Sequence, residues 1–367
     1  IPVQYTRKQI FEFAESELLA IENELKVPGS NEYGRVDRVA GWFLLARMYL
    51  NAQTWINENK YQEAYIYATK VIADGHYPLA SDYREIFLAD NNTCKEIIWP
   101  LVQDGLRAQS SAGTNFYVKA FVNGPMDELY KTGVGSRGWG NVRAKVSLVD
   151  AFDADDVMFD GNDTWGNNKK DKRAQFMTAL PNQVKDTWDV NMDMTSTFTC
   201  GYGYIKWRNV TKEDELSASG DAYTSIDFPL FRTADAYLMA AEAILRGASG
   251  TKSEALGYVN EVRIRAYMSG KYAKNGVRSD VSGEIGANEL DLDFLLLERQ
   301  KELASELIRR TDLIRFGKYT KGNNWDWKNG VRLGGDVDDK YNLFPIPESE
   351  LTNNPTLVQN DGYKVIK

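Results

Sequence analysis

The chain has 367 residues, of which 43% are hydrophobic, 12% aromatic and 26% charged, and its formal net charge is −8. This composition excludes a mainly disordered or fibrous chain, and the length allows about two domains or one large irregular unit. The acidic balance disfavours binding to a phosphate backbone, so a nucleic-acid partner is not expected.

The first part of the chain has helical periodicity. Apolar residues spaced by three and four predict helices over 6–25, 37–51 and 60–73. The apolar face of the first helix consists of Ile10, Phe13, Ala14, Leu18 and Ile21. In the third helix the small residues Ala64 and Ala68 would let two antiparallel helices approach closely, as they do in tetratricopeptide repeats.

Residues 90–230 are rich in Gly, Asn, Asp and Trp, and they contain only short strand-like runs, at 97–102 and 202–207. A long irregular stretch that a compact chain retains is usually functional or disordered, and the aromatic residues argue against disorder. We therefore predict that the ligand-binding region lies here.

Helical periodicity returns after residue 230. A second pair of helices is predicted around 237–262, followed by a long helix over 289–308, a short one over 312–319 and an extended tail. The predicted fold is mainly α, with a tetratricopeptide-like scaffold, a large loop-rich region and minor β elements. Its parts, 1–89, 90–230 and 231–367, are expected to form one intertwined globular unit.

Three tryptophans lie in the irregular region. Trp139 and Trp165 stand in loops of Gly, Asn and Asp, and Trp188 follows them. The face of an indole suits the CH face of a sugar ring, while neighbouring polar groups can bond its hydroxyls. We predict that these three rings stack on sugars; each could instead anchor its loop to the scaffold. The predicted site is completed by Arg137, Asn141 and Tyr117.

The remaining reactive residues indicate little chemistry. The acidic run with Asp153, Asp155 and Asp160 could hold calcium, but no Glu closes the twelve-residue calcium loop, and a solvated loop explains the run as well. No other metal and no cofactor is expected. Glu and Arg residues near the end of the long helix are expected to form ion pairs between helices rather than a catalytic site.

The single histidine and the two cysteines give no catalytic or metal motif. His76 follows a helix in a Gly-containing segment, where it is expected to have a C-terminal cap or turn role, and a catalytic triad would have to use it. Cys94 and Cys200 have no CxxC spacing, and the sequence does not decide whether a single disulfide joins them.

Several motifs together resemble the SusD/RagB-like family of outer-membrane glycan-binding lipoproteins. The most characteristic are FRTADAYLMAAEA at 231–243, VNEVR at 259–263, ERQKEL at 298–303, DLIRFGK at 312–318 and FPIP at 344–347. The resemblance covers nearly the whole chain in the family's order. Family members normally have a longer N-terminal region with a lipidated cysteine, and the chain is similar to the remaining part only.

The resemblance implies a non-enzymatic protein, lipid-anchored on the extracellular face of the outer membrane of a Gram-negative bacterium. Such a protein binds an oligosaccharide or polysaccharide and delivers it to a SusC-like TonB-dependent transporter. Two alternatives remain. The same scaffold could bind peptides or another protein, or the chain could be a glycoside hydrolase, although no pair of acids stands out in the sequence.

Overall fold

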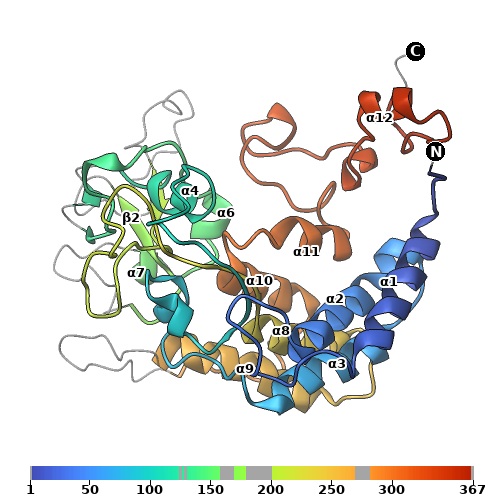
Figure 1. The fold of residues 1–367 in the computed structure, drawn as a ribbon, viewed down its shortest axis with the longest axis horizontal. Helices are drawn as coiled ribbons and strands as arrows, with labels where there is room; N and C mark the ends of the chain where they lie inside the picture. The colour runs from blue at the N-terminus through green and yellow to red at the C-terminus, as the bar shows by residue number, and fades with distance from the viewer. Residues whose placement is uncertain are drawn as a thin grey trace.

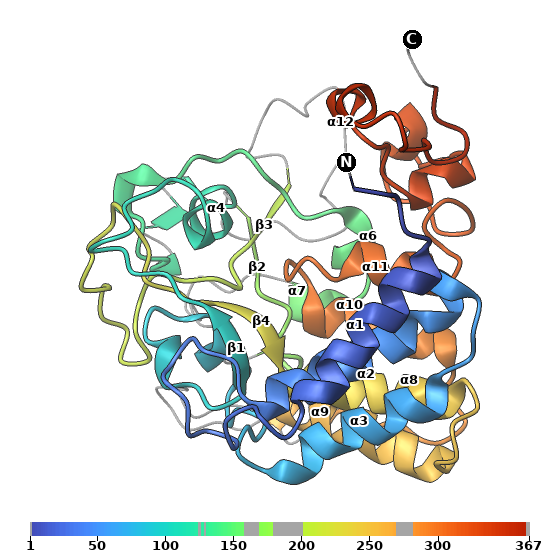
Figure 2. The ribbon, with the colours of Figure 1, turned by 45° about the vertical axis from the view of Figure 1, so that its right-hand side comes forward.

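The computed structural model describes residues 2–123, 126–127, 130–157, 169–178, 201–268 and 282–364. The longer helices pack together on one side of the molecule, beside a region of irregular chain and short strands (Figures 1 and 2). The longer helices are α1 (Arg7–Ile21), α2 (Arg38–Ile56), α3 (Tyr61–Asp74), α8 (Thr233–Leu245), α9 (Lys252–Met268), α10 (Leu292–Leu303) and α11 (Arg309–Arg315). The short helices are α4 (Thr114–Lys119), α6 (Val146–Val149), α7 (Ala154–Val157) and α12 (Glu348–Asn353). Within these described ranges, no helix combines the length and the apolar character needed to cross a membrane.

Helices α2, α3 and α8 form the centre of the helical scaffold. Helix α2 begins at the cap Asp37, whose Oδ1 accepts a hydrogen bond from the Val39 backbone N–H at 2.9 Å, and it ends at Asn57 in a left-handed conformation. Helix α3 packs against both α2 and α8, and its Ala64 and Ala68 are fully buried. Small side chains allow this close approach, and the predicted mainly helical, tetratricopeptide-like fold is confirmed.

Two details of the predicted helices are wrong. In α1, Phe11 is the buried residue, whereas Ile10 and Phe13 are exposed; only the Ala14 and Leu18 part of the predicted face packs on the core. The long helix predicted over 289–308 is α10, which is shorter at both ends. Its chain turns at Ser305 and Leu307, both with positive φ, and this turn directs Glu306 into the interior.

Short antiparallel strand pairs organise the irregular region. β1 (Ile97–Leu101) pairs with β4 (Phe228–Arg232), and β2 (Phe176–Thr178) pairs with β3 (Tyr202–Tyr204). Beside them, the fully buried Trp207 ring stacks on Phe228, with centroids 5.5 Å apart and planes 9° apart. Trp207 is therefore a core residue, and the region has a hydrophobic core of its own.

A buried network of ion pairs joins the irregular region to the helices. Arg232, at the end of β4, donates to Glu96 at 2.9 Å, to Glu302 of α10 at 2.7 Å and to Glu306 at 2.7 Å. Arg265 of α9 pairs with Glu96 and Glu302 as well. The expected ion pairs between helices are thus present, and all five side chains lie in the interior. Buried charges persist only when they are paired, so this network specifies how these segments fit together.

Candidate functional site

The loop that carries Trp139 is fixed to the end of α4. The backbone N–H groups of Trp139, Gly140 and Asn141 donate to the carbonyls of Lys119, Val122 and Ala120, each at 2.8 Å. Gly138 permits this approach, because a Cβ at that position would lie only 2.6 Å from the Val122 carbonyl oxygen. The loop is therefore held on the scaffold by its backbone rather than by burial of its indole.

The Trp139 ring lies at the surface beside a second aromatic ring. Trp139 is 37% exposed and Phe116 of α4 is 44% exposed, and their ring centroids are 6.3 Å apart. Tyr117 differs: it is half-buried and packs against the core rings of Trp207 and Phe228. Of the predicted aromatic residues with described positions, Trp139 is thus open to a ligand, whereas Tyr117 contributes mainly to the support beneath.

Charged and polar groups stand next to these rings. Arg137 is exposed and its Nε lies 3.0 Å from the Asp221 carboxylate, and Asn141 is also exposed. Burial, and then the nearby Arg137 charge, lower the pKa of the Lys119 ammonium group, which donates to the Ala222 carbonyl. We call Phe116, Arg137, Trp139, Asn141 and Asp221 the Trp139 surface. It offers ring faces together with donors and acceptors.

Several predicted residues lie outside the described ranges. These are Trp165, Trp188, Asp160 and Cys200, and the side chain of Asp155 is not described either. Asp153 is exposed, and the described residues contain no group of three potential metal ligands. The calcium site stays a prediction.

The histidine and the remaining cysteine are placed by the structure. His76 is exposed and lies in the turn after Gly75. Gly75 is the left-handed cap of α3, so of the two predicted roles His76 has the turn role and not the cap role. Cys94 carries a free thiol, and burial raises its pKa to about 12, so this thiol is not poised as a nucleophile.

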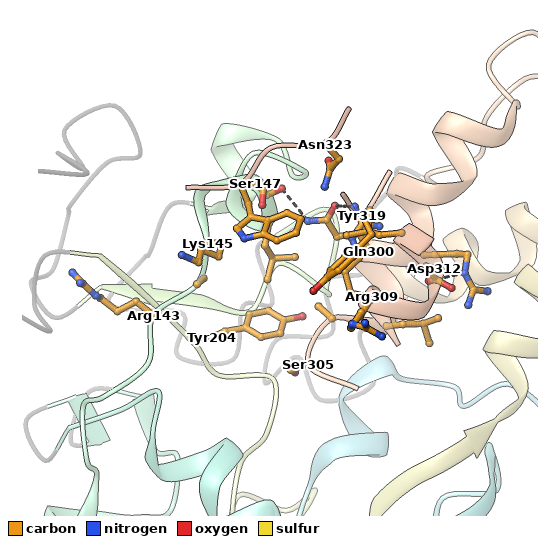
Figure 3. Close-up of a pocket in the computed structure, with 18 of the residues that line it drawn as sticks. Arg143, Lys145, Ser147, Tyr204, Gln300, Ser305, Arg309, Asp312, Tyr319 and Asn323 are labelled. Carbon is orange, nitrogen blue, oxygen red and sulfur yellow. Dashed lines mark hydrogen bonds and ion pairs between the residues drawn. The ribbon is translucent and has the colours of Figure 1, made fainter. Parts of the chain in front are cut away.

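A cavity of about 410 Å³ was not predicted (Figure 3). It lies between α6, α10 and α11, and the segment 319–325 covers part of it. Its aromatic lining consists of Phe121, Tyr204, Tyr319 and Trp325. The signal that could have revealed it is Trp325 in a Gly- and Asn-rich stretch, the same pattern that drew attention to Trp139. Its size lies in the range of small-molecule sites.

Comparison with known proteins assigns the chain to a family. The SusD family model matches residues 95–363. This chain belongs to the SusD family. Within this SusD family, the chain is 32% identical to the starch-binding protein SusD of Bacteroides thetaiotaomicron, over 99% of this chain and 67% of that protein. It is 25% identical to SusD-like protein P25 of Formosa agariphila, over 90% of this chain and 59% of that protein.

Solved structures show the same fold. A SusD-like protein from Bacteroides fragilis superimposes with a TM-score of 0.67 at 20% identity, covering 98% of this chain and 72% of that one. Surface glycan-binding protein A of Bacteroides thetaiotaomicron, in complex with laminarihexaose, gives a TM-score of 0.66 at 21% identity, with 98% and 72% covered. The predicted family resemblance is confirmed. The chain spans about six-tenths to seven-tenths of the length of these SusD-family proteins.

Proposed function

We propose that this SusD-family protein is a non-enzymatic binder of oligosaccharides or polysaccharides on the extracellular face of the outer membrane. It is anchored there by a lipid and delivers its glycan to a SusC-like TonB-dependent transporter. The names of its relatives support the glycan part, since one is a starch-binding protein and another is a surface glycan-binding protein in complex with laminarihexaose.

The observation that carries the proposal is the exposed pair of rings at Trp139 and Phe116. Two large aromatic side chains are costly to leave in water unless they have a partner. Here the backbone hydrogen bonds of the Trp139 loop fix its main chain, and with it the place of the indole beside Phe116, before any ligand arrives. A fixed ring loses little conformational entropy on binding, and Arg137, Asp221 and Asn141 supply polar partners for sugar hydroxyls.

The test is affinity electrophoresis on a panel of polysaccharides, followed by calorimetry with an oligosaccharide of the best one. Trp139→Ala is expected to weaken binding by about tenfold, the loss of one stacked ring. Trp55→Ala is the matched control, because Trp55 is 39% exposed but lies on α2 of the scaffold. It is expected to leave the affinity unchanged.

Two results would overturn the proposal. One is equal glycan affinity for the Trp139→Ala and Trp55→Ala proteins, and the other is binding of peptides with no polysaccharide retained on the gel. Delivery is tested separately, by co-purification with a SusC-like transporter from outer membranes that contain both proteins. If no such complex is recovered, the transport part of the proposal fails while glycan binding stands.

A further inference from the structure

The aromatic walls of the cavity favour a ring-shaped ligand. Tyr319 and Trp325 lie with centroids 5.8 Å apart and planes tilted by 35°, and Phe121 and Tyr204 form a second pair at 6.4 Å. Leu148 of α6 adds to the apolar lining. Apolar and aromatic walls of this kind accept a ligand whose faces are rich in C–H groups.

The cavity also carries positive charge without a matching carboxylate. Among the described residues, neither Arg309 nor Arg310 of α11 pairs with an acid. Arg309 donates to the Leu296 carbonyl at 2.9 Å and to the Gln300 side-chain oxygen at 2.7 Å, and Arg310 donates to the Tyr341 carbonyl at 2.8 Å. All these acceptors are neutral, so no carboxylate among the described residues compensates either charge. The Arg310 guanidinium group also lies over the rings of Tyr319 and Phe344, at 4.9 and 4.2 Å from their centroids, which stabilises its charge in part.

The acid in the cavity wall does not neutralise these arginines. Asp312 accepts from Arg299 through one oxygen at 2.9 Å and from Arg315 through the other at 2.8 Å. Burial lowers the pKa of Arg309 to about 10, although Asp312 acts against this shift. The buried Nε of Arg310 has no acceptor among the described groups. On the other side of the cavity, Arg143 and Lys145 turn their charged ends away from its centre (Figure 3).

Hydroxyl partners are present as well. The Ser305 hydroxyl accepts from the Trp207 indole N–H at 3.0 Å, which leaves its own proton available to a ligand oxygen. Asn323 lies at the opposite side of the cavity from Ser305 in Figure 3 and provides an amide. A purely aromatic acid would leave these polar groups unused, whereas a sugar ring would bond them.

We propose that this cavity is a second carbohydrate site, which binds a sugar ring that carries a carboxylate, such as a uronate residue of an acidic glycan. Arg310 lies over one face of Tyr319 and Lys328 over one face of Trp325, so the sugar ring packs against the parts of these rings that line the cavity, and its carboxylate pairs with Arg309 and Arg310. Guanidinium groups match the planar geometry of a carboxylate, and both arginines line the cavity without an acid partner among the described residues. The inference rests on the proposed glycan binding and adds the class of sugar.

The experiment compares trigalacturonate with neutral maltotriose by calorimetry. The wild-type protein is expected to bind trigalacturonate, and Arg310→Gln is expected to weaken this binding by at least about tenfold, since a charged hydrogen-bonding partner is lost. Rising salt is expected to weaken it too. Arg35→Gln is the matched control, because Arg35 is exposed and, within the described ranges, its ion pair is with Glu32 three residues away.

Because Arg310 also contacts residues 341–342, a second variant separates binding from folding. Trp325→Ala is expected to lose trigalacturonate binding as well, while circular dichroism and the melting temperature show that the fold persists. No binding of trigalacturonate, or unchanged binding in both variants, overturns the inference. Benzoate that competes as well as the acidic sugar overturns its sugar part.

The outcomes distinguish this inference from the proposed function. If neutral glycans bind and lose affinity with Trp139→Ala, while trigalacturonate does not bind, the glycan-binding function stands and the acidic-sugar site falls. If no glycan of either kind binds, the proposed function falls as well. If Trp139→Ala leaves trigalacturonate binding intact while Trp325→Ala removes it, two separate sites are established.

Discussion

The Trp139 and Phe116 rings lie 6.3 Å apart and are tilted by 59° to each other, although 22 residues separate them in the chain. The link between them is the backbone pairing of the Trp139 loop with the end of α4, which also carries Phe116. The two rings therefore belong to one rigid surface rather than to two independent loops.

This geometry predicts coupling between the two rings in glycan binding. If one ligand contacts both rings, the Phe116→Ala/Trp139→Ala double variant will lose an amount of binding free energy that differs from the sum of the two single-variant losses by about 0.5 kcal/mol or more. A double-mutant cycle by calorimetry measures this difference. Pairing Trp139→Ala with Trp55→Ala gives the control cycle, in which the losses should add. Strict additivity in both cycles would contradict a shared ligand surface.

Gly138 is expected to position the Trp139 loop. A Cβ there meets the Val122 carbonyl oxygen at 2.6 Å, so Gly138→Ala must push the loop away from α4 and should weaken glycan binding by about tenfold or more. Calorimetry measures the affinity, and urea unfolding measures stability, for which we expect a loss of about 1–3 kcal/mol.

Gly257 gives the matched control for this substitution. It lies in α9, and a Cβ there meets nothing within 4 Å. Gly257→Ala is expected to stabilise the protein by up to about 1 kcal/mol and to leave the affinity unchanged. Equal glycan affinity in the Gly138→Ala and Gly257→Ala proteins would show that the loop does not depend on this contact.

Periodicity in the sequence was sufficient to predict the scaffold but not every face of it. In α3 the buried residues Tyr61, Ala64, Ala68 and Val71 follow a single helical stripe, so their burial could be predicted. Helices α2 and α8 are apolar and buried on most sides, and this also indicates a central position. Helix α1 has apolar residues on two sides, Phe11 on one and Ile10 and Phe13 on the other, and spacing alone cannot choose between them. The end of α10 was missed because its last predicted turn contains good helix formers, whereas the ion pairs of Glu306 decide the local conformation.

The site could be predicted only in part, for a similar reason. A tryptophan in a Gly-rich loop is visible in the sequence, and Trp139 is indeed at the surface. Its partner Phe116 could not be recognised, because the contact depends on long-range backbone hydrogen bonds. The cavity draws Phe121, Tyr204 and Trp325 from three distant segments. The Gly- and Asn-rich stretch around Trp325 marks one of its walls, but no local pattern indicates that the three segments meet. The glycan role of Trp165 and Trp188 stays a prediction.

Removing Arg232 is expected to destabilise the protein strongly. Its guanidinium group faces Glu96, Glu302 and Glu306, and without it these buried carboxylates lose a shared counter-charge. Arg232→Met should lower the free energy of unfolding by about 3–5 kcal/mol, as measured by urea denaturation. Arg107→Met is the control, because the Arg107 pair with Asp104 is exposed and should be worth less than about 1 kcal/mol. Similar losses in the two proteins would refute a structural role for the buried network.

Glu242 of α8 makes stability depend on pH through its pairing with α11. Arg315 binds both carboxylate oxygens, at 2.7 and 2.8 Å, and Arg246 approaches one of them at 2.8 Å. Burial alone would raise the pKa of this carboxyl, but the charge of Arg315 outweighs it and lowers the pKa to about 2.

The sign of the effect follows from the two pKa values. The carboxyl titrates near 4.5 in the unfolded chain and near 2 in the folded protein, so between these values the unfolded chain binds more protons. The stabilisation by Glu242 is therefore complete above about pH 4.5 and is lost as the pH falls towards 2. Its expected size is about 3 kcal/mol.

Glu242→Gln should remove this pH-dependent part. We expect the variant to be less stable than the wild type at pH 7, and the difference between them to shrink as the pH falls from 5 to 3, in urea unfolding at each pH. Glu12→Gln, on the exposed side of α1, should follow the wild-type curve throughout. A difference in the free energy of unfolding between Glu242→Gln and wild type that stays constant over this pH range would contradict the prediction. It would mean that packing of the side chain, rather than its charge against Arg315, holds α8 to α11.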